Sequence, residues 1–373
     1  MGRTRATIAL NINPQVLRWA REEAGYDVSE IAEKVDISPE QYKLWEKEGK
    51  NVPLGKLKDL AGTYKRQLAV FLLPETPAKI SKPKDYRNLK PTESKFSKKV
   101  LEVMRDVNYF CDMALELQGE SYWKTRYEWI VEAREKIKDN HSFHTQLRQL
   151  LNISIEDQLQ FETDYEAYRK WRSAVEDRLG VLVFQFSMPI NEVEGFCLTE
   201  KFPYAIVVNS NYTYYHRIFT IFHELAHIIR NQSSICLFEK ATARQPEEWK
   251  CNEFAGTFLA PSNTIEQADN LKDITTYANR LKISREVYLR RLKEENKISD
   301  MKFFNLLEQI KSTYKKIEKK KGPVAIKPEV KSRASRGETF YNMVLDAMSN
   351  NRISYTQAAS ALNLNVSRLL HEI

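Results

Sequence analysis

The sequence predicts a mostly α-helical chain with a small β-sheet, an all-α N-terminal domain and a helical C-terminal tail. Glycine is scarce, at 11 of 373 residues, which favours helices over tight turns. Apolar residues recur with helical spacing along most of the chain. Only three short segments have the residue composition that is typical of β-strands: 181–187, 195–198 and 205–209.

Composition and charge divide the chain into five expected parts. These are an N-terminal domain (1–74), a basic linker (75–99), a larger α+β domain with a helical N-terminal part (100–310), a second basic linker (311–336) and a small helical tail (337–373). The second linker holds ten Lys/Arg and two Asp/Glu, which equals the whole net charge of +8. Such segments either neutralise nucleic-acid phosphates or form solvated linkers.

The composition also excludes several classes of protein. Hydrophobic residues make up 42% of the chain, which is enough for a buried core and argues against wholesale disorder. No apolar run approaches the ~18 residues of a membrane span, and the first residues lack the apolar region of a secretory signal. The four cysteines form no CxxC pair. We therefore expect a cytoplasmic protein with no membrane partner and no disulfide framework.

The N-terminal domain carries clear helix boundaries. Four stretches have helical apolar spacing: 14–24, 28–35, 38–47 and 54–73. Asn13 and Ser38 each precede a proline, which places an N-cap residue before proline at the first helical position. Gly25 and Gly49 stand where helices are expected to end. These features predict a compact module of short helices.

The most informative segment is His223-Glu224-Leu-Ala-His227, an HExxH motif within an apolar helix from 217 to 230. Positions i and i+4 share one helix face, so both histidines can bind one metal ion. Glu224 can reach a metal-bound water without binding the metal itself. Because zinc lowers the pKa of such a water toward ~7, the carboxylate can then accept its proton. The motif predicts a Zn²⁺-dependent hydrolase.

A zinc site of this kind needs a third protein ligand. On the next expected helix, 247–259, three acids compete for this role: Glu247, Glu248 and Glu253. We favour Glu248, because Asn252 then lies one turn further on the same face and could hydrogen-bond the second nitrogen of a ligand histidine. The buried face of this helix is expected to carry Phe254, Ala255 and Phe258.

His216 lies about two turns before His223 on the same helix face. It could stabilise the oxyanion of a tetrahedral intermediate, a role that tyrosine and arginine can also play. The nearby alternatives are Tyr212, Tyr214, Tyr215 and Arg217. Each of these side chains could instead serve only in packing.

At these residues the sequence resembles the ImmA/IrrE family of zinc metallopeptidases. That family carries HELxH, then a helix of the form E-x-x-A-N-x-F-A, then a stretch with leucine and proline. The corresponding segments here are 223–227, 248–255 and 258–261, with Cys251 in place of the usual alanine. The resemblance covers residues 165–295 and implies an α+β zincin-like fold. It also implies that His223, His227 and Glu248 bind zinc and that Glu224 is the catalytic base.

Residues 14–74 resemble the Xre/Cro-type helix-turn-helix. In such folds the third helix enters the major groove, and Pro39, Glu40, Gln41 and Lys43 would then face the bases. Gln41 can recognise adenine, and Glu40 can accept a hydrogen bond from cytosine. The expected phosphate contacts are Arg3, Arg5, Lys50, Lys56 and Lys58. The expected core residues are Ile31, Ala32, Leu44 and Trp45.

The charge of this domain is a weak signal for DNA binding. Residues 1–74 hold twelve basic and ten acidic residues, so protein contacts or dimerisation stay an alternative use of the module. Two further segments, 274–292 and 353–370, have the apolar spacing of two helices around a turn. Each is either a second helix-turn-helix or a packing element.

Together these features favour a DNA-binding regulator with zinc-dependent endopeptidase activity. By the resemblance, the substrate would be a specific protein partner, such as a repressor or a toxin encoded nearby, whose cleavage controls transcription. The alternative is a transcriptional repressor or an antitoxin of a toxin–antitoxin pair, whose zincin-like domain binds a partner without turnover. A homodimer is expected, because Xre-type modules usually bind palindromic DNA.

Overall fold

The computed structural model describes residues 8–77, 96–137, 140–231, 235–236, 246–314 and 326–370. The chain forms two compact units. The first comprises Met1–Ser81 with Leu89–Asp106, and the second comprises Lys82–Asn88 with Val107–Ile373. Helices dominate and the sheets are small, which confirms the predicted fold class. Among the described residues, no helix is long and apolar enough to cross a membrane.

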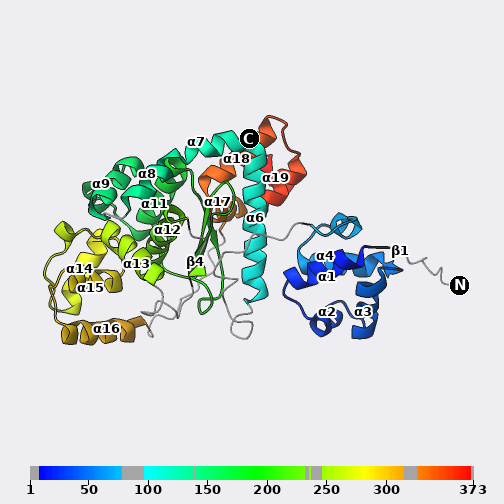
Figure 1. Cartoon of the computed structure of the whole chain (residues 1–373), viewed down its shortest axis with the longest axis horizontal. Coiled ribbons are helices and arrows are strands. Elements are labelled where there is room, and N and C mark those ends of the chain that lie inside the picture. The colour runs from blue at the N-terminus through cyan, green and yellow to red at the C-terminus, as the bar shows by residue number, and fades with distance from the viewer. Residues whose placement is uncertain are drawn as a thin grey trace. The chain divides into compact units, whose positions relative to one another are not determined.

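The first unit is a bundle of short helices with a two-stranded antiparallel sheet (Figure 1). Its elements are β1 (Ala9–Leu10), α1 (Pro14–Glu23), α2 (Val28–Lys34), α3 (Pro39–Glu48), β2 (Val52–Pro53), α4 (Leu54–Tyr64) and the 3-10 helix η1 (Leu68–Leu72). The side chains of Asn13 and Ser38 cap α1 and α3 as expected. Gly49 ends α3 with φ of 68°, and a Cβ there would lie 2.1 Å from the carbonyl oxygen of Ile12.

The expected fourth helix, 54–73, is too long. Helix α4 ends at Tyr64, and Lys65 takes the left-handed conformation with φ of 54°. The chain then turns into η1, which buries Phe71 with its ring 6.3 Å from that of Tyr64. Two glycines, Gly55 and Gly62, also lower the helix propensity of this segment. Apolar spacing alone did not reveal that the turn is needed to bring Phe71 into the core.

The prediction that Leu44 belongs to the core of this unit is wrong. Ile31, Ala32 and Trp45 are buried, but Leu44 is 44% exposed. The inward face of α3 is taken by Tyr42, Trp45 and Glu46, which leaves Leu44 on the outer face. The buried Glu46 accepts a hydrogen bond from Arg21 Nε at 2.8 Å and so connects α1 to α3.

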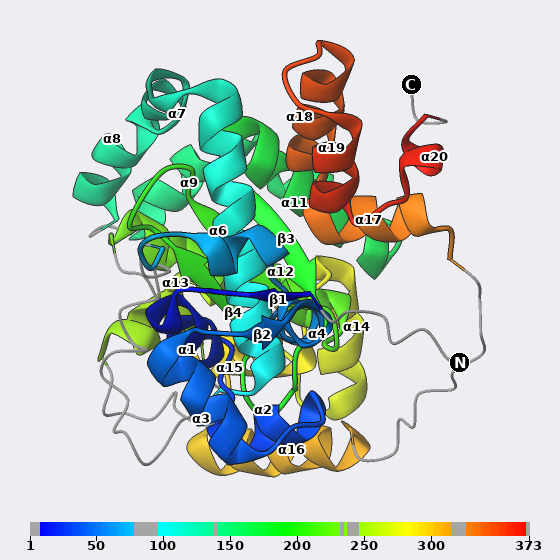
Figure 2. The same ribbon diagram turned by 90° about the vertical axis from the view of Figure 1, so that its right-hand side faces the viewer.

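The second unit surrounds a four-stranded sheet with helices (Figures 1 and 2). Helix α6 (Lys98–Gln118) enters it at Val107. The following elements precede and flank the sheet: α7 (Glu120–Arg126), α8 (Glu128–Lys136), α9 (Asn140–Leu151), α10 (Ile155–Leu159), α11 (Asp164–Leu179), α12 (Tyr214–Ile229) and α13 (Pro246–Leu259). After them come η2 (Ser262–Thr264), α14 (Leu271–Leu281), α15 (Arg285–Glu294), α16 (Asp300–Tyr314), α17 (Pro328–Arg336), α18 (Glu338–Ser349), α19 (Tyr355–Leu362) and α20 (Val366–Leu369).

The sheet has the order β3-β5-β4-β6. Its strands are β3 (Leu182–Phe186), β4 (Gly195–Leu198), β5 (Ala205–Asn209) and β6 (Ile235–Cys236). Strands β3 and β5 are parallel, while β4 runs antiparallel to both of its neighbours. Every residue of β4 and β5 is buried, as expected for strands covered on both faces. The three predicted strands are present, and β6 was missed because two residues give no periodic signal.

The C-terminal helices pack onto the core of the second unit. Helix α17 lies against β3, and α18 lies against α11. Arg172 of α11 donates to the carbonyl oxygen of Ala334 at 2.6 Å, and a Cβ at Gly337 would lie 2.0 Å from Glu176 Oε1. The predicted linker 311–336 therefore contains the end of α16 and all of α17. The five-part division of the chain stays a prediction.

Candidate metal centre

Helix α12 carries the HExxH motif and packs tightly on the sheet. Residues 220–229 of this helix are all buried. A Cβ at Gly195 of β4 would lie 2.4 Å from Thr220 Cγ2 and 2.7 Å from the carbonyl oxygen of Val207. Only glycine permits this close approach of the strand to the helix. The same hypothetical Cβ of Gly195 would lie 3.6 Å from Glu224 Oε1.

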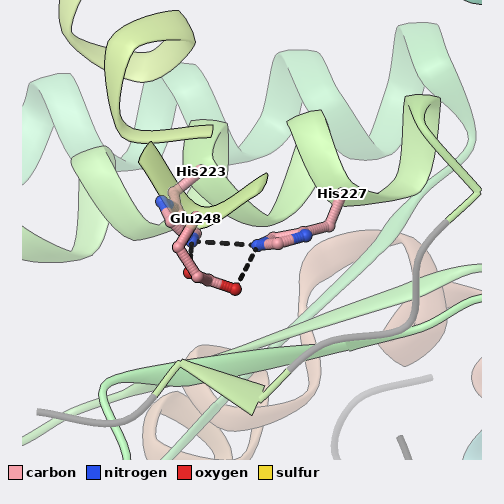
Figure 3. Close-up of side chains that lie close together, drawn as sticks. All are labelled: His223, His227 and Glu248. Carbon is pink, nitrogen blue, oxygen red and sulfur yellow. Dashed lines mark hydrogen bonds and ion pairs between the residues drawn. The ribbon is translucent and has the colours of Figure 1, made fainter. Parts of the chain in front are cut away.

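The structure brings His223, His227 and Glu248 together, with ligand atoms that lie within 4.8 Å of one another (Figure 3). The two histidine Nε2 atoms are 3.1 Å apart. Glu248 Oε2 lies 3.2 Å from Nε2 of His223, and Oε1 lies 3.3 Å from Nε2 of His227. Ligands bound tetrahedrally at zinc distances of 2.0–2.1 Å are about 3.3 Å apart. The donor set and its spacing therefore fit one zinc ion.

The electrostatics of this cluster suit a cation. Burial works against the protonated form of His223, but the Glu248 hydrogen bond and the charges of Glu224 and Glu248 raise the pKa of His223 above its usual value. Burial likewise opposes the charged form of Glu248, yet the two imidazoles hold the pKa of this carboxyl well below its usual range. The carboxylate is thus charged at neutral pH and ready to bind a positive ion.

Asn252 has the position that the helix spacing predicted. Its Oδ1 lies 2.9 Å from Nδ1 of His223. An amide oxygen accepts hydrogen bonds, so this contact requires the proton on Nδ1 and leaves the lone pair of Nε2 facing Glu248 and His227. This contact favours the neutral tautomer of His223 whose Nε2 could bind a metal ion.

The helix that presents Glu248 is held firmly at its C-terminal end. The last carbonyl groups of an α-helix have no partner within the helix. Here Arg148 donates to the carbonyl of Phe258 at 2.7 Å, and Gln158 donates to that of Leu259 at 3.0 Å. Arg291 donates to the carbonyl of Ala260 at 2.9 Å. All three side chains are buried, and the positive charges complement the helix dipole.

We expect the change Asn252→Ala to weaken zinc binding by about 10–100-fold, because the partner that orients the His223 ring is lost. The matched change Asn252→Asp keeps an oxygen acceptor and should bind zinc more tightly than the alanine variant. Competition with a chromogenic chelator measures both affinities. Zinc affinity of Asn252→Ala within twofold of the unmodified protein would show that Asn252 does not orient the ligand.

Other predicted site residues lie elsewhere. The Nε2 atom of His216 is 3.2 Å from Glu194 Oε2, so this histidine faces another acid and not the triad. Glu253 is half-buried, and the charged side chains that act on it are Glu294, Arg291 and Arg230. The side chain of Glu247 lies outside the described residues. Sequence reasoning did not single out Glu194. Its position immediately before a glycine of a predicted strand was the available signal.

In the first unit, the predicted base-reading residues line the outer face of α3. Glu40, Gln41 and Lys43 are exposed, as is Lys50 after the helix. Lys56 instead donates to the carbonyls of Val35 and Asp36 at 2.6 and 3.0 Å. Arg3 and Arg5 lie outside the described residues. Among the described residues, the side of α3 that the prediction requires is therefore exposed.

The fold and the donor set are those of a metallopeptidase-like domain joined in one chain to a helix-turn-helix domain. Comparison with known families agrees: residues 176–293 match the family described as the IrrE N-terminal-like domain, and residues 17–71 match the helix-turn-helix family. These matches confirm the two resemblances that the motifs indicated. No curated protein and no solved structure matches the chain.

Proposed function

We propose that this protein is a cytoplasmic DNA-binding regulator with zinc-dependent endopeptidase activity, which cleaves a specific protein partner such as a repressor. The observation that carries the proposal is the convergence of His223, His227 and Glu248 beside the buried Glu224. Two imidazoles and one carboxylate are the protein donor set of catalytic zinc sites, and His223, His227 and Glu248 would supply it here.

In the proposed reaction, His223, His227 and Glu248 would hold Zn²⁺, with Asn252 orienting His223. The ion, when bound, supplies Lewis acidity to the attacking water and to the scissile carbonyl. Glu224 accepts the proton of that water and then delivers it to the leaving amine nitrogen. The apolar surroundings of α12 exclude bulk water and strengthen these interactions.

The test of this proposal is hydrolysis of proteins encoded beside the gene by the zinc-loaded protein. Cleavage of one partner at one bond, lost on chelation and restored by zinc, is the expected result. The helix-turn-helix domain in the same chain supports a reaction that takes place on DNA. A protease held on DNA has a raised effective concentration for a repressor bound next to it.

The DNA-binding part has its own prediction. Gln41→Ala is expected to cost about 1–3 kcal/mol on a duplex selected from random sequences, and to relax specificity at one base pair. Lys50→Ala should weaken all duplexes alike and lower the slope of log affinity against log salt by about one. Fluorescence anisotropy measures both, with Lys124→Ala in the second unit as control. Equal loss from all three variants would contradict the assignment of α3.

The second candidate is a repressor or an antitoxin whose metallopeptidase-like domain binds a protein partner without turnover. The presence of the helix-turn-helix domain in the same chain favours it. Sequence-specific DNA binding together with a stable, uncleaved complex at full zinc occupancy would support this candidate over the first. A homodimer on palindromic DNA is part of both proposals.

A further inference from the structure

A carboxylate and an imidazole outside the metal triad lie together at the beginning of α12. Glu194 Oε2 is 3.2 Å from Nε2 of His216. The His216 ring stacks on Tyr212, with ring centroids 4.1 Å apart and planes 12° apart. Tyr212 in turn donates to the carbonyl of Ile190 at 2.6 Å. The cluster is therefore fixed by the segment that leads into β4 and by the segment that begins α12.

This cluster lies on the same side of α12 as the metal triad. His216 and His223 are seven residues apart, so they share a helix face and are separated by about 10.5 Å along the axis. The His216 ring contacts Glu194 and Tyr212. Because an extended peptide rises about 3.3 Å per residue, the same distance corresponds to about three residues of substrate.

The backbone places Glu194 beside the proposed catalytic group. Its carbonyl accepts a hydrogen bond from the backbone N–H of Asn209 at 3.0 Å, which ties it to β5. The next residue, Gly195, is the one whose absent Cβ lets the strand approach Thr220 and Glu224. A peptide lying along α12 toward the metal would therefore pass the Glu194 side chain.

The chemistry of the cluster favours a positively charged side chain as its ligand. Within the described part of the chain, the one ion pair of Glu194 is with His216, a residue that does not carry a permanent charge. The two side chains are 27% and 29% exposed, so the carboxylate is accessible yet partly desolvated. A lysine or arginine side chain could form a charge-assisted hydrogen bond to Glu194.

We propose that Glu194, with His216 and Tyr212, forms a subsite for a basic side chain of an extended peptide, about three residues from the bond at the metal. This inference rests on the proposed function only in that the peptide approaches the zinc site. It makes Glu194 a specificity-determining residue, and it assigns substrates with lysine or arginine at one fixed distance from the cleaved bond.

The test uses peptide hydroxamates, which bind the zinc ion and thereby fix the register of the peptide. Two series of otherwise neutral peptides are used. One series carries the hydroxamate at the C-terminus, and the other carries it on a succinyl group at the N-terminus. Lysine, glutamine or glutamate is placed at each of the first four positions. Affinity for the zinc-loaded full chain is measured by calorimetry, so that no turnover is needed. Zinc content is measured separately for each sample.

One position is expected to favour lysine over glutamine by about tenfold, with glutamate weaker still. The change Glu194→Gln should reduce that preference to about twofold or less, while neutral hydroxamates bind as before. The matched control is Glu200→Gln, at the other end of β4. Equal affinity for lysine and glutamine at every position, or a preference that survives Glu194→Gln, would overturn the subsite. A preference without hydrolysis of any protein would refute the proposed activity and leave the subsite standing.

Discussion

Replacing Glu224 with glutamine is expected to lower hydrolysis of the partner by about 10²–10⁴-fold while zinc stays bound. Glutamine has nearly the same shape as glutamate but cannot accept a proton. Glu224 is fully buried on α12 and adjacent to His223, which allows it to act on a water at the metal without binding the metal. The three proposed ligands are unchanged in this variant, so metal content should match that of the unmodified protein.

Elemental analysis and single-turnover cleavage measure the two quantities separately. The matched control is Glu253→Gln, since Glu253 is a half-buried acid on α13 whose charged neighbours are Glu294, Arg291 and Arg230. It should leave the cleavage rate unchanged. Turnover by Glu224→Gln within tenfold of the unmodified protein, at equal zinc content, would remove Glu224 from the role of base.

Replacing Arg172 with methionine is expected to destabilise the second unit by about 3–5 kcal/mol at pH 8, because the buried carboxyl of Glu176 loses its cationic partner. Arg172 Nε donates to Glu176 Oε1 at 3.3 Å, and both side chains are buried. The guanidinium also donates to the carbonyls of Ala334 and Val183. The variant therefore loses contacts between α11, β3 and the C-terminal helices together.

The loss should depend on pH. Burial raises the pKa of Glu176 to about 7 even with Arg172 present, and the guanidinium works in the opposite direction. Without that positive charge the pKa of Glu176 rises further. The folded variant then keeps its proton at pH values where the unfolded chain has released it, so its stability falls as pH rises from the usual carboxyl range toward neutrality.

Urea denaturation at pH 5 and pH 8 tests this prediction, and the deficit should be larger at pH 8. Arg169→Met, on the exposed side of the same helix, is the control and should change stability little. The double change Arg172→Met with Glu176→Leu should recover part of the loss, because no buried charge is left. A deficit below about 1 kcal/mol at both pH values would contradict the importance of this pair.

The residues of the candidate metal centre could be predicted from the sequence because the spacing within each of its two helices is local. Helical spacing alone puts His223 and His227 on one face, and the same spacing relates Glu248 to Asn252. The choice among three acids depended on that second relation, and the structure places Glu248 against both histidines. Helical periodicity of this kind predicts which side chains share a helix face.

Features that depend on tertiary packing could not be predicted. Leu44 has the spacing of a core residue, but Tyr42 and the Arg21–Glu46 pair occupy the inward face of α3. The end of α4 at Tyr64 depends on where Phe71 must pack. The contact between Glu194 and His216 joins the residue before β4 to α12 across intervening chain, so no periodic pattern indicates it.

The central claim is most directly tested by intact-mass spectrometry of the full chain expressed together with the proteins of its immediate genomic neighbours. Unmodified protein and Glu224→Gln are compared after zinc content has been confirmed in both. The account predicts that one neighbour, or the chain itself, is shortened at a single bond only with the unmodified protein. Intact masses throughout at full zinc occupancy, or the same cleavage with Glu224→Gln, would contradict it.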